Sequence, residues 1–333
     1  MNPASLSPVA GRPMLSRVAD SMYWMARYVE RAEHVARVLH VTDMLLADVG
    51  DFDAAARRHQ WSGVLRTFHL DAADAPASGD GDAIVRRLTF DAGEVTSIRS
   101  CIRMARENAR AIRDNLSSEI YEELNALFWQ LGDERTHIDF VDSPARFYDR
   151  VTSFGLLFQG LCDQTLARDQ RWHFAQAGKW LERIDVTCRL LEVRLGDVPA
   201  DGADASRSPV QALETMAALR MSGGLEAFRR RNPATLGPRR VAEFVILAGD
   251  FPRGISFATE AALASVIAIR TATGHGGRGE AADAERHLGR LAGHLRYSRI
   301  EDLMEKSLTG ELAKIRQTAR VAAKCITRAY FPA

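Results

Sequence analysis

The feature that most constrains the fold of this chain is a heptad-like pattern between Leu15 and Leu46. Apolar residues recur there at alternating spacings of three and four, which is the period of the buried side of a long α-helix. A second stripe, one residue further on and about 100° round the helix, contains Glu30, Glu33 and Arg37. These carboxylates therefore flank the buried side of the predicted helix and do not face away from it.

The same pattern returns around Glu182 and Arg183, at an offset of 152 residues from Glu30 and Arg31 (182 minus 30). An apolar seam over residues 174–195 is again flanked by a stripe that carries two acids and an arginine. Self-similarity of this kind indicates an internal repeat. We interpret the two segments as copies from an internal duplication.

A small residue stands one turn before each of the two glutamates, Ala26 in the first copy and Gly178 in the second. Small side chains allow another backbone to approach closely. We therefore expect a neighbouring helix to enclose each carboxylate at this point.

The rest of the chain is also predicted to be helical, because strand signals are nearly absent and the β-branched residues fall in helical registers. The predicted fold class is all-α, with two internally repeated helical bundles packed into one helical unit. Residues 14–169 form the first repeat and residues 170–333 the second, after a disordered extension over residues 1–13; Met1 and Met14 are both candidate start codons. Further helices are predicted over residues 94–116, 144–167, 250–270 and 311–330, with other starts at Ser118, Ser208 and Ser298.

Charge and cysteine content argue against several classes of protein. A net charge of +1 provides no electrostatic footprint for nucleic acid or for an anionic membrane. The longest apolar stretch, residues 261–269, is too short to span a bilayer, and no signal peptide opens the chain. The four cysteines form neither a CxxC pair nor a zinc-type cluster with histidine. We therefore expect reduced core thiols and a cytoplasmic protein.

Two interpretations apply to the acids of the stripes, which are Glu30, Glu33, Glu182 and Asp185. In the structural interpretation, the acids are partly buried and neutralised by arginines, including the i,i+4 partners Arg37 and Arg189. In the functional interpretation, the repeats bring both stripes together around a pseudo-twofold axis. The acids then form an anionic pocket for an amine, a metal ion or an arginine side chain, with perturbed pKa values.

Five arginines share one face of the helix predicted over residues 94–116: Arg99, Arg103, Arg106, Arg110 and Arg113. Like charges at these spacings repel one another unless negative charge lies opposite. This face therefore complements the acidic stripes. It is expected to be paired internally, to be solvated, or to bind a phosphate or peptide carboxylate.

No metal site and no cofactor are predicted. A di-metal carboxylate bundle needs a Glu-x-x-His sequence on each of two helices, and only Glu134 to His137 has this spacing. His34 follows Glu30 by four residues, but Val186 stands at the matching place in the second copy. No phosphate-binding loop, nucleophile elbow or catalytic cysteine context is visible either.

Four blocks of sequence resemble the bacterial alpha-E domain family. They are MLSRVADSMYWMARYVERAEHVARVL from Met14, ARENARAIRDNLSSEIYEELN from Ala105, AGKWLERIDVTCRLLEV from Ala177 and DFPRG from Asp250. The resemblance extends over residues 14–331, and four blocks in the same order make it specific. The family is named for its helical content and its Glu-Arg motif, and it has no established activity.

The resemblance implies a role beside ATP-grasp ligases, transglutaminase-like peptidases and Ntn-type hydrolases in peptide synthesis or modification. We therefore expect a non-catalytic helical accessory protein that works with an ATP-grasp ligase or another pathway protein; a homo-oligomer is left open. The alternative is an enzyme of that pathway, with Glu30 and Glu182 as general acid/base groups or amine-binding anions beside an arginine-lined anion pocket. The candidate binding residues are Glu33, Asp185, Arg31, Arg183, Arg106, Arg110, Asp250 and Arg253.

Overall fold

The structure is a computed structural model and describes residues 16–49, 54–196, 209–232, 236–274, 277–305 and 307–331. Within these ranges it contains fifteen α-helices, two short 3₁₀-helices and no strand, which confirms the all-α fold class. The predicted disorder of residues 1–13 and the predicted cap at Ser208 lie outside the described residues. The elements are α1 (Ser16–Val49), α2 (Ala54–Thr67), η1 (Ala72–Asp74), α3 (Asp82–Phe90), α4 (Ile98–Ala111), η2 (Arg113–Asn115), α5 (Ser118–Gly132), α6 (Glu134–Asp142), α7 (Pro144–Thr165), α8 (Gln170–Leu195), α9 (Pro209–Met221), α10 (Leu225–Arg231), α11 (Pro238–Leu247), α12 (Ile255–Thr273), α13 (Glu280–Tyr297), α14 (Ile300–Met304) and α15 (Leu308–Tyr330).

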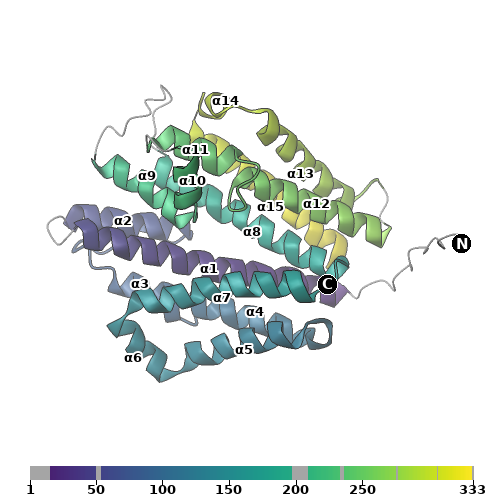
Figure 1. The fold of residues 1–333 in the computed structure, drawn as a ribbon, viewed down its shortest axis with the longest axis horizontal. Coiled ribbons are helices and arrows are strands. Elements are labelled where there is room, and N and C mark those ends of the chain that lie inside the picture. Colours follow the sequence, from purple (N-terminus) through teal and green to yellow (C-terminus); the bar gives the residue numbers. More distant parts are fainter. Residues whose placement is uncertain are drawn as a thin grey trace, which may run out of the picture.

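The two helices with the heptad-like seam, α1 and α8, lie side by side through the middle of the molecule (Figure 1). The helices run in the same direction, because Tyr23 of α1 meets Gly178 of α8, and Arg31, two turns later, meets Glu182. The described seam residues of both helices are buried, as their periodicity predicts.

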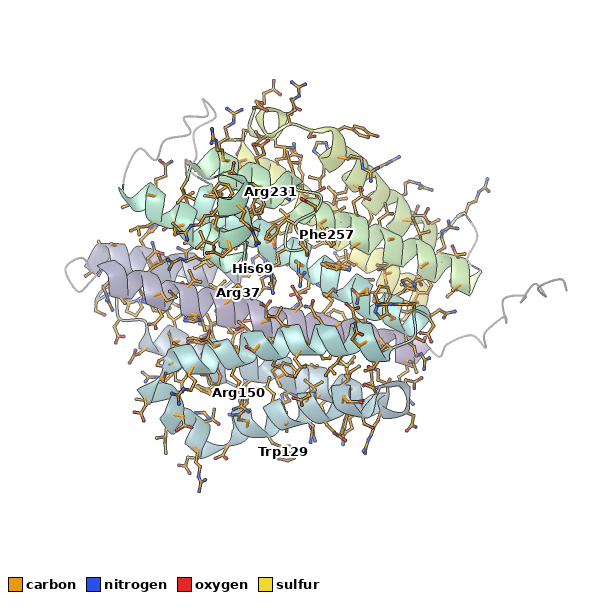
Figure 2. All side chains as sticks on the ribbon, in the orientation of Figure 1. Arg37, His69, Trp129, Arg150, Arg231 and Phe257 are labelled. Carbon is orange, nitrogen blue, oxygen red and sulfur yellow. The ribbon has the colours of Figure 1, made fainter. Side chains whose placement is uncertain are left out.

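The remaining helices lie on the two sides of this central pair. α4 and α7 pack against α1, with α5 and α6 outside them, whereas α12 and α15 pack against α8 and α13 covers both (Figure 1). The buried apolar side chains form one continuous core. The outermost layer also exposes some apolar side chains, such as Trp129 of α5, which is 62% exposed and projects from the edge of the molecule (Figure 2).

The glycine at position 178 allows the backbones of α1 and α8 to come into close contact. A Cβ atom at Gly178 would lie 2.2 Å from the carbonyl oxygen of Tyr23. Only glycine leaves room for that carbonyl, so the expectation of a close approach at this position is confirmed. The approach also brings the glutamate of each helix within reach of the arginines of the other.

Three helix starts differ from the sequence prediction because other side chains satisfy the first N–H groups. α4 begins at Ile98, not at residue 94, since Ser97 Oγ accepts the N–H of Ser100 at 3.1 Å, and it ends at Ala111. α15 begins at Leu308, not at residue 311, since Ser307 Oγ accepts the N–H of Gly310 at 3.2 Å, whereas α5 begins at Ser118 as predicted, with Ser117 as its N-cap residue. α14 has Arg299 as its N-cap residue, whereas the hydroxyl of Ser298 donates to the carbonyl of His294 at the end of α13.

The DFPRG segment forms a tight turn and does not open a helix. Gly254 is the N-cap residue of α12, which begins at Ile255. The turn is closed by the Gly254 N–H, which donates to the carbonyl of Phe251 at 2.8 Å. Asp250, the first residue of the helix predicted over residues 250–270, is instead paired with Arg231 on the surface.

By length and composition alone, one helix of the described residues could cross a membrane, namely α12. The whole helix is long and apolar enough to cross a bilayer, whereas the apolar stretch 261–269 by itself is too short. The helix is 44% buried within the protein and packs against α8 and α13. A core helix of a soluble protein passes the same test, so this observation is weak evidence for a membrane span.

Candidate functional site

The acids of the two stripes meet arginines from the facing helix in the centre of the molecule. Glu182 of α8 is 0% exposed and accepts four hydrogen bonds from two guanidinium groups of α1. Arg27 Nε and Nη2 lie 2.9 and 2.7 Å from Oε2, and Arg31 Nε lies 2.6 Å from Oε1. Arg27 also packs over the rings of Tyr23 and Trp24. These contacts orient its guanidinium towards Glu182.

The reciprocal contact is made by the glutamate of α1. Glu30 is 1% exposed, and Arg183 of α8 donates to it from Nε at 2.5 Å and from Nη2 at 2.7 Å. Gln159 of α7 donates a third hydrogen bond at 2.8 Å. The Glu-Arg pair of each helix therefore binds the Glu-Arg pair of the other, Glu30 with Arg183 and Glu182 with Arg31.

The second acid of each stripe is also neutralised. Glu33 is paired with Arg37 on its own helix and receives two hydrogen bonds from Arg253, at 3.0 and 2.8 Å. Asp185 is paired with Arg189, 2.7 Å away on its own helix, and with Arg320 of α15 at 2.8 Å. Both predicted i,i+4 pairs are thus confirmed.

The arginines lower the pKa values of the buried acids. Burial alone would raise the pKa of Glu182, but the guanidinium groups of Arg31 and Arg27 outweigh it and hold the pKa far below its usual range. Burial is likewise outweighed at Glu30 by Arg183, and at Glu33 by Arg253 and Arg37, so both pKa values are lowered. All three carboxylates are therefore ionised at neutral pH.

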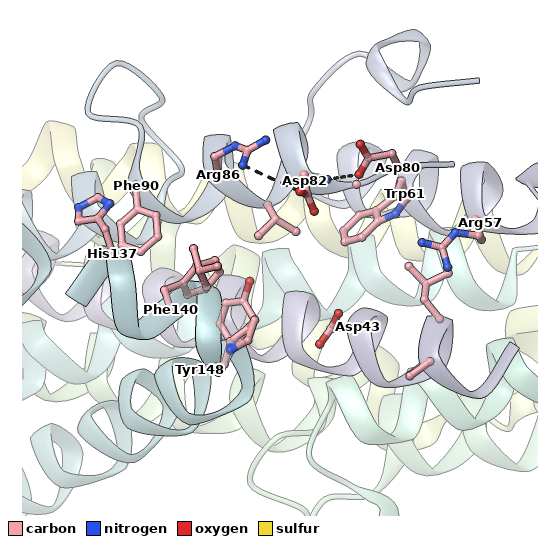
Figure 3. A pocket seen from close by; sticks show the side chains of 16 residues that line it. Asp43, Arg57, Trp61, Asp80, Asp82, Arg86, Phe90, His137, Phe140 and Tyr148 are labelled. Carbon is pink, nitrogen blue, oxygen red and sulfur yellow. Dashed lines mark hydrogen bonds and ion pairs between the residues drawn. The ribbon is translucent and has the colours of Figure 1, made fainter. Parts of the chain in front are cut away.

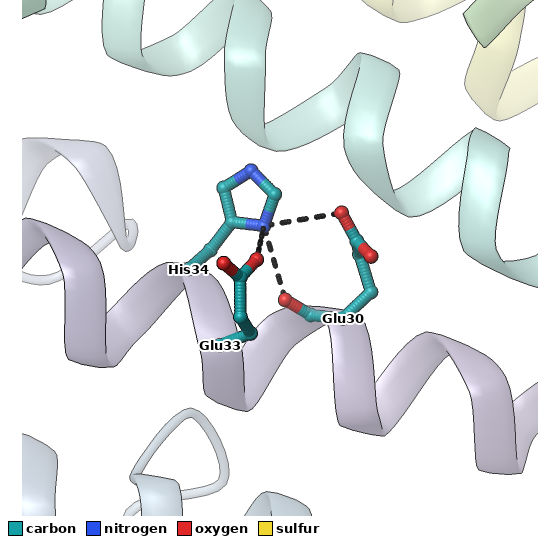
Figure 4. A group of neighbouring side chains, drawn as sticks. All are labelled: Glu30, Glu33 and His34. Atoms are coloured by element: carbon teal, nitrogen blue, oxygen red, sulfur yellow. Dashed lines mark hydrogen bonds and ion pairs between the residues drawn. The ribbon is translucent and has the colours of Figure 1, made fainter. Parts of the chain in front are cut away.

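The structure brings one trio of metal-type ligands together: Glu30, Glu33 and His34 (Figure 4). The ligand atoms lie within 4.8 Å of one another. His34 Nδ1 is 3.0 Å from the carbonyl oxygen of Glu30, and burial lowers the pKa of the imidazole, so the ring is neutral and Nδ1–H donates to that carbonyl. The carboxylates already bind Arg183 and Arg253, whose positive charges oppose a metal cation. The trio therefore does not fit a resident metal ion.

The arginine stripe of α4 does not face these acids, contrary to the complementarity expected from the sequence. Arg106 Nε donates to Asn125 of α5 at 2.8 Å, and its guanidinium lies 4.4 Å from the ring centre of Phe128. Arg110 is paired with Glu107 on its own helix. The stripe lies on the side of α4 that meets α5 and solvent, because the apolar stripe beside it packs on α1.

The structure therefore separates the predicted site residues into a central group and a peripheral group. The central group contains Glu30, Arg31, Glu33, Glu182, Arg183, Asp185 and Arg253. Arg106, Arg110 and Asp250 lie elsewhere, and among the described residues their ion pairs are with Glu107 and Arg231. Sequence reasoning missed Gln159 and Arg320, because neither belongs to a motif and each reaches its acid only through the packing of another helix.

The structure is that of an all-helical protein in which two central helices each carry a Glu-Arg pair that binds the other. The chain belongs to the Alpha-E family, described as a predicted alpha-helical domain with a conserved ER motif, and the family model matches residues 14–331. It is 23% identical over 315 residues to uncharacterized proteins of Mycobacterium bovis and of two strains of Mycobacterium tuberculosis. The match covers 90% of this chain, and the chain spans about a third (34%) of the length of these relatives. No solved structure matches the chain.

Proposed function

We propose that this protein is a non-catalytic helical accessory protein of an ATP-grasp-dependent system for peptide synthesis or modification. Its Glu-Arg motifs act as the internal framework that holds the helices together, and its outer surface receives a ligase or another pathway protein. The observation that carries the proposal is the reciprocal binding of Glu30 to Arg183 and of Glu182 to Arg31, with both carboxylates buried.

The state of the carboxylates supports a structural role. A general acid or base needs a proton that it can exchange at neutral pH and a position that substrate can reach. Glu182 has no exposed surface and a pKa far below its usual range, and both of its oxygens already accept hydrogen bonds from arginines. Removing one partner of such a pair leaves the other charge buried without compensation, which makes these residues important for stability.

The length of the relatives supports the partner role. In the mycobacterial proteins the matching segment is joined to a much longer chain, of which it forms about a third. In those proteins it therefore stands beside other polypeptide segments. By the same reasoning, we propose that this chain works beside other proteins of its pathway, in the cytoplasm, where its four buried free cysteines would remain reduced.

The reciprocal geometry also supports the proposal that the chain arose by duplication. The same dipeptide occupies residues 30–31 and 182–183, and each copy binds the other at the contact between α1 and α8. A Glu-Arg helix that pairs with a second copy of itself forms two such ion pairs at once. An ancestor with one Glu-Arg helix would have formed the same contact as a homodimer, and fusion of two genes would have preserved it.

The proposal is tested by affinity purification of the tagged full-length protein from its host, followed by mass spectrometry and a reconstituted ligase assay. We expect an ATP-grasp ligase to co-purify and its ATP-dependent amide formation to increase when this protein is added. A variant with Glu119→Gln, which removes one exposed charge of α5, serves as the matched control and should behave like the wild type. Turnover of a peptide or amine by this protein alone, abolished by Glu182→Gln in a folded variant, would contradict the proposal.

A further inference from the structure

A cavity of about 770 Å³ lies on the other side of α1 from α8, where the end of α1 meets α2, α3, α6 and α7 (Figure 3). Its volume is in the range of pockets that hold small molecules, roughly 300–1,000 Å³. None of the Glu-Arg network residues lines it. A ligand in this cavity therefore would not contact the Glu-Arg network.

The inner walls of the cavity are aromatic. Figure 3 shows Phe90, Phe140 and Tyr148 gathered on one side and Trp61 on the other. Phe140 packs edge-to-face against both Phe90 and Tyr148, with ring centres 5.1 and 5.7 Å apart. Trp61, Phe140 and Tyr148 are buried in the core. These rings hold one another in place, and they form a preorganised surface for a flat apolar group.

The charged side chains that line the cavity include more carboxylates than guanidinium groups: Asp43, Asp80 and Asp82 against Arg57 and Arg86 (Figure 3). Asp43 and Asp80 are exposed lining residues, and neither has an ion-pair partner among the described side chains. Asp82 and Arg86, also at the mouth, lie 3.9 Å apart and offset each other. A carboxylate next to aromatic faces favours a cation, because both the charge and the ring quadrupole attract it.

The indole N–H of Trp61 is not accessible from the cavity. Trp61 is 4% exposed, and its Nε1–H makes no hydrogen bond among the described residues. The edge of its ring is covered by Gly81, where a Cβ atom would lie 1.9 Å from the indole. The protein itself therefore covers the indole N–H, and Trp61 lines the cavity only with the accessible part of its ring.

We propose that this cavity binds an apolar amine, of the chemical class found at the free amino end of an aromatic or large aliphatic residue. The apolar group lies between Trp61 and the Phe140–Tyr148 wall. The ammonium group lies at the mouth beside Asp43 and Asp80.

The experiment is a calorimetric titration of the full-length protein with three small probes that share one ring. Phenylalaninamide carries both the amine and the carbonyl, phenethylamine only the amine, and N-acetylphenylalanine a carboxylate without a free amine. We expect saturable binding of the first two with similar affinity, and binding of the acetylated probe at least about tenfold weaker. Equal or tighter binding of N-acetylphenylalanine would overturn the proposal. So would the absence of saturable binding of either amine.

Isosteric variants locate the bound amine. Asp43→Asn and Asp80→Asn should each weaken phenethylamine binding roughly two- to fivefold, as expected for exposed ion pairs. The amide of the Asp80→Asn variant keeps an oxygen that can accept the N–H of Asp82, so the start of α3 stays intact. Glu119→Gln removes a charge outside the cavity and should have no effect.

A second variant separates binding in the cavity from binding elsewhere. Ala47→Phe places a ring at the exposed side of the cavity wall and should abolish binding of both amines while the melting temperature stays within about 2 °C of the wild type. Undiminished binding in a folded Ala47→Phe variant, or equal loss in the Glu119→Gln control, would refute this location of the ligand.

Discussion

Glu182→Gln is the substitution that tests the central network most directly. The wild-type carboxylate is 0% exposed and neutralises Arg27 and Arg31, whose side chains are only 14% and 20% exposed. The amide keeps the shape and one acceptor oxygen but no charge, so both guanidinium groups remain in a mostly buried place without compensation. Breaking a buried ion pair in this way costs about 3–5 kcal/mol. That is a large fraction of the roughly 5–15 kcal/mol by which a protein is stable.

The assay is equilibrium unfolding in urea, monitored by helical circular dichroism, at pH 7 and in parallel for Glu119→Gln. We expect a fall of about 3–5 kcal/mol in the free energy of unfolding for Glu182→Gln. The exposed control should stay within about 0.5 kcal/mol of the wild type. Replacing both Glu182 and Arg31 by methionine should recover part of the loss, because no buried charge of that pair remains. A loss below about 1 kcal/mol at Glu182→Gln would refute the view that the motif is structural.

Acidification provides an independent check with a defined sign. The pKa of Glu182 in the folded protein lies below its value in the unfolded chain. The contribution of the ionised carboxylate to the free energy of unfolding is therefore complete above the unfolded pKa of about 4.3. It is lost progressively as the pH falls through and below that value towards the folded pKa. The difference in stability between the wild type and Glu182→Gln should therefore be constant from about pH 6 to 7 and should narrow between about pH 5 and 3. A difference that widens on acidification would contradict the assignment.

Three further measurements probe the packing. Gly178→Ala should destabilise the protein by at least about 1–3 kcal/mol, because its Cβ would collide with the Tyr23 carbonyl, whereas Gly160→Ala, with open space around it on α7, should be neutral or slightly stabilising in the same denaturation assay. Burial, together with neighbouring Arg183, lowers the pKa of Lys179 to about 8. The charge of Lys179 therefore lowers the stability of the folded protein at pH 7, and this loss disappears as the pH rises from 8 towards about 10.4, the pKa of the unfolded chain. Lys179→Met should therefore raise the free energy of unfolding at pH 7 by up to about 3 kcal/mol. The increase of stability with pH that the wild type shows above pH 8 should be absent in this variant. A destabilised variant would show that other groups compensate the charge of Lys179. The four buried thiols should react with a thiol reagent only after unfolding, and rapid labelling of the native protein would show that the core opens.

Much of the framework could be read from local patterns. The 3-and-4 spacing of apolar residues depends only on helix geometry, and it predicted both α1 and α8 and their buried seams. The pairs Glu33–Arg37 and Asp185–Arg189 are one helical turn apart, so they too follow from the sequence alone. Helix ends were less predictable, because at Ser117 and Gly254 the choice between neighbouring residues depends on how the chain enters the helix.

The partners across helices were decided only by the tertiary structure. Periodicity places Glu30 and Glu182 on the flank of a buried side, but it does not state the register or direction of the facing helix. The close approach of Gly178 to Tyr23 sets that register, and it brings Arg31 to Glu182 and Arg183 to Glu30. The aromatic cavity likewise needs side chains from five helices that share no motif in the sequence. A single chain determines which surfaces must be buried, and the packing of all helices together determines which groups meet there.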